Sequence, residues 1–198
     1  RVTDESAVKI VEMVLSGDLN KNIVSSINSQ GGNGVGISGK DASLVICEKD
    51  HPKLGFVGKP ILINTKLITT LVENDFIPVI SPIGTNEKGE TFNINADTMA
   101  GSIASALKAD RLLLLTDVEG VKDKNGEKIE KAPLKEIKKL INQNIIKDGM
   151  IPKVNTAIDA IEKGVRAVVI LDGSIQNACL LELFTDHGVG TLIREEID

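Results

Sequence analysis

The segment Arg111-Leu112-Leu113-Leu114-Leu115-Thr116 decides the fold class of this chain. Four consecutive leucines are typical of a strand in a parallel sheet that is covered on both faces. Apolar residues at helical spacing precede this segment in residues 95–108 and follow it in residues 134–141. A buried strand between two amphipathic helices predicts an α/β layered architecture.

The same alternation of helix and strand extends over the whole chain. Further helices are expected at residues 7–14 and 23–27 with a break near Gly17, at 67–72, and from Pro152 to 161. Further strands are expected at 35–38, 44–47, 76–80, 166–171 and 191–193, with 55–64 extended and a hairpin turn at 124–126. Pro78 places its strand segment near a strand start or a sheet edge. Because no long linker interrupts the pattern, residues 1–198 are predicted to form one α/β domain with a mainly parallel sheet.

Composition excludes several classes of protein. With 41% hydrophobic and 26% charged residues, the chain has the balance of a globular protein. A net charge of -5 without a basic block, together with 2% aromatic residues, argues against a nucleic-acid partner. The longest apolar runs fall far short of the roughly 20 residues that cross a bilayer, so no membrane partner is expected. Cys47 and Cys179 are expected as thiols in or near the core, in a reducing compartment, and no metal site is predicted.

A glycine-rich stretch from Gly34 to Lys40 resembles two nucleotide fingerprints and fits neither. The dinucleotide fingerprint must follow a strand and open a helix, but here a helix precedes the glycines and a strand runs through them. In a phosphate loop, Asp41 would stand where a hydroxyl should reach magnesium, and no helix follows. The stretch is therefore interpreted as a strand and turn bounded by glycines.

Polar side chains alternate where the strand before residues 95–108 ends. Asn93, Asn95 and Asp97 follow one another at every second position. The carboxyl end of a strand is where open α/β sheets bind ligands, so a ligand site is expected here. Asn95 by itself is also explained as a helix cap.

Two further segments have the chemistry of a nucleotide site. The first directly follows the four-leucine strand and is Thr116-Asp117-Val118-Glu119-Gly120-Val121. It is either a nucleotide-binding turn or a simple Asx turn. Lys153 lies in the first turn of a helix, where the helix dipole disfavours a cation. A phosphate would supply an anionic partner for it, whereas a solvated surface lysine is the simpler alternative.

Seven segments, taken in order, resemble the acetylglutamate kinase family. They are RVTD at 1–4, VGISGKD at 35–41, IPVI at 77–80, NINAD at 93–97, TDVEGV at 116–121, GMIPK at 149–153 and ELFTD at 182–186. The resemblance implies the amino-acid-kinase fold, a three-layer αβα sandwich similar to carbamate kinase. It also implies phosphorylation of N-acetyl-L-glutamate by ATP, with Mg, in arginine biosynthesis. The joint presence of the NINAD and GMIPK segments separates the chain from sibling kinases.

The resemblance assigns roles residue by residue. Arg1 and Asn93 correspond to anchors for acetylglutamate, and a guanidinium fork suits a carboxylate. Asp97 corresponds to the aspartate that orients catalytic lysines, and Lys153 to a lysine that stabilises the transferring phosphoryl group. Residues 1–92 are then the remainder of the acetylglutamate-binding part and 93–198 the ATP-binding part. The ATP-binding residues implied are Thr116, Asp117, Val118, Glu119, Gly120, Val121, Asp148, Gly149 and Met150.

The family pattern also begins earlier than this chain. A glycine-rich phosphate loop with a second lysine has no counterpart here, so the chain is expected to lack the amino-terminal third and to be inactive alone. The alternatives are another kinase of the same fold, acting on glutamate, aspartate, carbamate or UMP, and a non-catalytic nucleotide-binding regulatory module.

Regulation and assembly are implied by the same resemblance. Glu182 and Gly188 match the arginine effector site of sensitive members, although Val169 replaces a common histidine. A homodimer or hexamer is expected, in the cytoplasm or a plastid stroma. The nitrogen-signalling PII protein is an expected partner if the source is a cyanobacterium, alga or plant.

Overall fold

A computed structural model describes residues 2–185 and 188–196 of the chain. Contacts between residues divide the chain into two compact units, Arg1–Met99 and Ala100–Asp198. Asn93 and Asp97 therefore belong to the first unit, whereas the sequence division at residue 93 assigns them to the second part. That each part binds its own ligand stays a prediction.

The first unit opens with one long helical segment. It consists of α1 (Glu5–Glu12), the π-helix η1 (Met13–Leu19) and α2 (Asn20–Ser29). The Asp4 side chain caps α1 by accepting from the Ala7 amide at 2.7 Å. The predicted break near Gly17 is wrong, because the chain passes this glycine in wider π turns without leaving the helix. The buried Asn20 then donates to the carbonyls of Ile37 and Val79, at 3.3 and 2.8 Å.

Two sheets form the rest of the described first unit. β1 (Gly34–Ser38) pairs in parallel with β4 (Ile77–Ser81), which follows α3 (Lys66–Glu73). The second sheet has the order β3-β2-β5-β6, with β3 (Gly58–Ile63), β2 (Val45–Lys49), β5 (Ile83–Thr85) and β6 (Thr91–Asn93). Short 3₁₀ turns occur at Asp41–Ser43 and Pro52–Leu54.

The strand that contains Pro78 differs in part from its prediction. Pro78 is the second residue of β4, which confirms its expected place near a strand start. Ile77 is exposed, so the start of the strand is not the buried segment that its apolar sequence predicts. The buried core of this unit lies instead around Leu44, Ile83 and Phe92.

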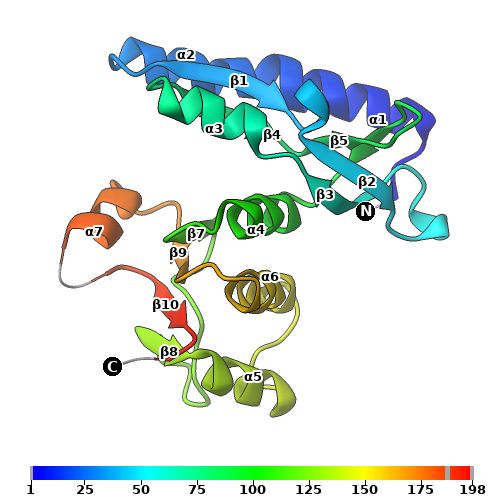
Figure 1. Cartoon of the computed structure of the whole chain (residues 1–198). Helices are drawn as coiled ribbons and strands as arrows, with labels where there is room; N and C mark the ends of the chain where they lie inside the picture. Colours follow the sequence, from blue (N-terminus) through cyan, green and yellow to red (C-terminus); the bar gives the residue numbers. More distant parts are fainter. Residues whose placement is uncertain (1, 186–187, 197–198) are drawn as a thin grey trace. The chain divides into compact units, whose positions relative to one another are not determined.

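The second unit is a four-stranded sheet with helices on both faces. Its strands are β7 (Leu112–Thr116), β8 (Lys131–Pro133), β9 (Val168–Asp172) and β10 (Thr191–Arg194), in the order β7-β9-β10-β8. α5 (Leu134–Asn142) and α6 (Met150–Glu162) lie on one side of β9 and β10, and α7 (Ala178–Phe184) lies on the other (Figure 1). α4 (Ala96–Leu107) runs across the boundary between the units.

Strand alternation sorts the four leucines of β7 between the two faces. Leu112 and Leu114 pack into the main core, and Leu113 packs toward the α7 side. β7 pairs in parallel with β9, as expected for this sequence. Leu115 is 49% exposed, however, so the prediction that both faces are covered is wrong at that residue.

The predicted hairpin turn is present. The turn at 124–126 joins an antiparallel bridge between Lys122 and Lys128. Small residues let α4 approach α6, because a Cβ on Gly101 would lie 2.6 Å from Thr156 Cγ2. Among the described residues, four of the seven strand pairings are parallel. The fold is thus an α/β layered arrangement with mainly parallel pairing, as predicted. None of its described helices has the length and apolarity needed to cross a membrane.

Candidate active site

Asn93 lies at the end of β6, beside the chain segment that enters α1. Its side-chain Nδ2 donates to Thr3 Oγ1 at 3.3 Å, and its backbone N–H donates to the Phe56 carbonyl at 2.9 Å. Thr3 is itself buried and pairs with Gly55 in a parallel bridge. Asn93 therefore lies next to the segment that follows Arg1, while Arg1 lies outside the described residues.

The other two polar residues of this segment have different roles. Asn95 Oδ1 accepts from the Thr98 amide at 3.0 Å, so the helix-cap interpretation of Asn95 is confirmed. Asp97 lies in the first turn of α4 and is half-buried. The helix dipole favours an anion at this position.

The turn after β7 has an exposed part and an anchored part. Thr116 Oγ1 lies 3.1 Å from Asp117 Oδ1, and Asp117, Val118 and Glu119 are exposed. Gly120 and Val121 are buried.

A single side chain holds the anchored part of this turn. Thr191 Oγ1 accepts from the Val121 amide at 2.8 Å and donates to the Ile129 carbonyl at 2.6 Å. Gly120 has φ +143°, and a Cβ there would lie 2.4 Å from Thr191 Oγ1. The exposed part can meet a ligand, while the glycine and Thr191 determine the path of the backbone.

A second polar turn lies beside this one and escaped the sequence analysis. Thr116 pairs with Asp172 at the end of β9, and the Gly173 amide donates to the Thr116 carbonyl at 2.8 Å. Hydrogen bonds from the Ser174 hydroxyl and amide lower the pKa of Asp172, which keeps this exposed carboxylate ionised. An Asp-Gly-Ser sequence directly after a buried strand was the available signal, of the same kind as Thr116-Asp117.

Lys153 lies in the first turn of α6, as predicted. Asp148 and Gly149 precede the helix and are exposed, and Asp148 has a left-handed backbone with φ +47°. Met150 packs partly against the main core, so its side chain anchors the start of α6. Lys153 is half-buried in this first turn, and the next residue, Val154, is buried in the core. This arrangement fixes the lysine backbone, as the role of a phosphoryl-stabilising cation requires.

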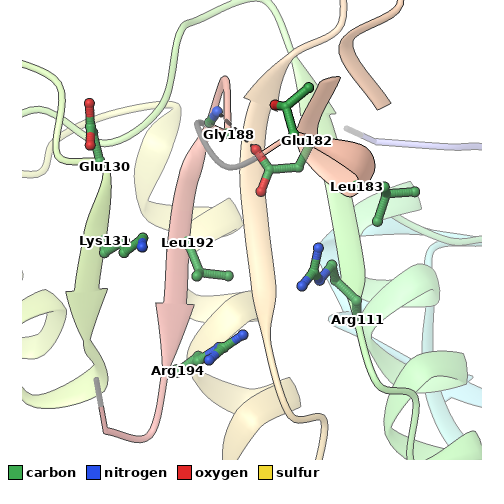
Figure 2. A pocket seen from close by; sticks show the side chains of 10 residues that line it. Arg111, Glu130, Lys131, Glu182, Leu183, Gly188, Leu192 and Arg194 are labelled. Carbon is green, nitrogen blue, oxygen red and sulfur yellow. Dashed lines mark hydrogen bonds between the residues drawn. The ribbon is translucent and has the colours of Figure 1, made fainter. Parts of the chain in front are cut away.

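The predicted effector residues line a cavity of about 460 Å³ in the second unit. Figure 2 shows Glu182 beside Gly188 in this cavity, with Lys131 on β8, Arg194 on β10 and Arg111 directly before β7. The Glu182 side chain is buried. Its Oε2 accepts hydrogen bonds from the backbone amides of Val189 and Gly190, at 2.9 and 3.3 Å. A Cβ on Gly188 would lie 2.4 Å from that oxygen, so a larger residue would require the Glu182 carboxylate to move. Glu182 thus already has a structural function, and its effector role stays a prediction.

Val169, which replaces a common histidine in the family pattern, does not line this cavity. It is fully buried in β9, where it packs with Leu171 and Ala178 beneath α7. At the position of the family's histidine, this chain therefore has a buried hydrophobic contact.

Within residues 2–185 and 188–196, no three His, Cys, Asp or Glu side chains gather in a way that would hold a metal ion. Mg²⁺ commonly keeps several waters and binds through substrate phosphates. Burial raises the pKa of the Cys47 thiol to about 11, so this cysteine behaves as a core residue.

Comparison with known proteins decides which fold family this geometry represents. The model of the Amino acid kinase family matches residues 1–172. The chain belongs to the amino acid kinase family. An acetylglutamate kinase from Ruegeria pomeroyi is 58% identical over 99% of the chain, which spans 68% of that relative.

Solved structures of the amino acid kinase fold agree. N-acetylglutamate synthase from Neisseria gonorrhoeae, complexed with coenzyme A and N-acetyl-glutamate, superposes with a TM-score of 0.89 at 25% identity, over 100% of this chain and 46% of that one. Giardia carbamate kinase gives a TM-score of 0.56 at 25% identity over 71% of this chain and 48% of that one. The predicted fold class and family are therefore confirmed. The roles assigned to single residues stay predictions.

Proposed function

We propose that the protein to which this chain belongs transfers the γ-phosphoryl group of ATP to the side-chain carboxylate of N-acetyl-L-glutamate. The products are N-acetyl-L-glutamyl 5-phosphate and ADP, and the reaction serves arginine biosynthesis. The observation that carries this proposal is the 58% identity to an acetylglutamate kinase over 99% of the chain. The carbamate kinase and the synthase that match by structure reach only 25% identity, so the other candidate substrates are not favoured.

The chemistry requires positioning and positive charge more than covalent help from the protein. A carboxylate oxygen attacks the γ-phosphorus while the bond to the β-γ bridging oxygen breaks, and negative charge spreads over the transferring group. Arg1 and Asn93 would hold acetylglutamate, and Asn93 already lies beside the segment that carries Arg1. Lys153 would stabilise the transferring group, and Asp97 would orient the lysines.

The adenine nucleotide has a separate set of candidate contacts in the second unit. The exposed residues 117–119 and 148–149 supply polar groups at the end of β7 and before α6. Mg²⁺ would enter with the nucleotide and neutralise part of the phosphate charge. A homo-oligomer, a cytoplasmic or plastid location and arginine inhibition belong to this proposal as expectations implied by the family. PII binding is expected only if the source is a cyanobacterium, alga or plant.

The test measures ADP release by the complete protein with acetylglutamate, glutamate, aspartate, carbamate and UMP as acceptors. Lys153→Ala should lower kcat by roughly 10²–10³-fold, because it removes a cation that acts on charge developed in the transition state. Lys163→Ala is the matched control, since Lys163 follows α6 and forms a surface pair with Asp159 at 2.7 Å. Preference for another acceptor, or equal turnover of the two variants, would contradict the proposal.

A further inference from the structure

The turn between β1 and β2 carries the glycine-rich motif that fits neither nucleotide fingerprint. Its Lys40 Nζ donates to Glu12 Oε1 at 2.8 Å and to Thr91 Oγ1 at 2.9 Å. Thr91 Oγ1 also donates to Glu12 Oε2 at 3.4 Å. Lys40 therefore joins the end of α1 to the start of β6.

The turn itself is fixed, so the position of Lys40 is determined by the sheet. Asp41 Oδ2 accepts from the Ser38 amide at 2.7 Å and from the Ser38 hydroxyl at 2.8 Å. Gly39 packs so tightly that a Cβ would lie 2.3 Å from the Ile83 carbonyl oxygen. The Asp41 carboxylate that disqualifies the motif as a phosphate loop is thus the group that closes the turn.

Contacts at the other end of α1 reach the same strand. Thr3 lies directly before the helix cap, and its hydroxyl accepts from Asn93 Nδ2 at 3.3 Å. The Phe56 amide donates to the Thr3 carbonyl at 2.7 Å, while the Phe56 carbonyl accepts from the Asn93 amide at 2.9 Å. α1 packs along β6 between these two sets of contacts. The helix is therefore tied to the strand near its beginning and, through Lys40, near its end.

We propose that Lys40 is a positioning residue for the acetylglutamate site, an inference that rests on the proposed function. Arg1 lies two residues before Thr3, and Asn93 lies two residues after Thr91 on the same face of β6. The alignment of α1 on β6 therefore sets the place of Asn93 relative to Thr3 and the start of α1. Lys40 and Glu12 are only 36% and 33% exposed, so solvent screens their pairing less than that of a surface ion pair.

The experiment compares variants of the complete protein in steady-state kinetics. Lys40→Met keeps the apolar stem and removes the ammonium group. It should raise KM for acetylglutamate by roughly tenfold or more, because small displacements of a bound group have large kinetic effects. KM for ATP should stay within about twofold, since no ATP-binding residue is moved.

Further variants separate positioning from a general loss of structure. Thr91→Val removes only the hydroxyl and should raise the same KM by a smaller factor, and Lys40→Arg should recover most of the parent value. Lys59→Met is the control, because Lys59 pairs with Glu48 at 3.7 Å on the exposed surface of the same unit. Circular dichroism checks that each variant is folded. If Lys40→Met does not fold, Thr91→Val carries the test.

The outcomes distinguish this inference from the proposed function. A parent protein that does not phosphorylate acetylglutamate refutes both. An active parent with Lys40→Met or Thr91→Val indistinguishable from Lys59→Met in KM for acetylglutamate refutes only the positioning role. Equal increases of KM for both substrates would also refute it, because they indicate general damage.

Discussion

Gly120→Ala offers a sharp test of how the candidate ATP-binding turn is built. The backbone at Gly120 has φ +143°, a conformation that alanine adopts only with strain of about 1–3 kcal/mol. The new Cβ would also lie 2.4 Å from Thr191 Oγ1 and would displace a hydroxyl that makes two hydrogen bonds. At about 1 kcal/mol for each bond, the total destabilisation should be roughly 3–5 kcal/mol.

Gly126→Ala is the matched control for this substitution. Gly126 has φ +83° but nothing within 4 Å of an added Cβ, so only backbone strain is expected there. Urea unfolding followed by circular dichroism compares the variants, since a chain without Trp or Tyr lacks the usual fluorescence probes. In a Thr191→Ala background the cost of Gly120→Ala should fall, because the displaced hydroxyl is gone. Equal destabilisation by the two glycine substitutions would refute the reasoning.

Three other expectations follow from the site. Because burial raises the pKa of Cys47 to about 11, a thiol reagent near neutral pH should modify the half-buried Cys179 first. Cys47 should react only on unfolding or as the pH approaches that value. Equal modification rates of the two cysteines would contradict this expectation. Arg1→Lys in the complete protein should raise KM for acetylglutamate, because an ammonium group cannot form a bidentate contact with a carboxylate, and an unchanged KM would place Arg1 outside the site. Glu182→Ala should lower the melting temperature, because two backbone amides lose their acceptor, and should relieve arginine inhibition if the parent shows it; a flat arginine titration of the parent would exclude the effector role.

The fold class and most of the elements follow from local sequence, whereas the short strands β5 and β8 were not predicted. The leucines of β7 and the apolar spacing of α4 and α6 are short-range patterns, and each predicts its element because side-chain direction repeats with a fixed period. Family motifs added the substrate class and the candidate residues Asn93 and Lys153. The cap formed by Asn95 was also predictable, since a cap involves residues only three apart.

Other features depend on which distant segments pack together. The helix continues through Gly17, where the sequence predicts a break. Asn20, three residues later, donates hydrogen bonds to backbone carbonyls of two strands. Thr191 holds the turn at Val121 from 70 residues away, and Lys40 meets Thr91 across 51 residues. Periodicity contains no information about such pairs, because strand order and register, rather than neighbouring residues, bring them within hydrogen-bonding distance.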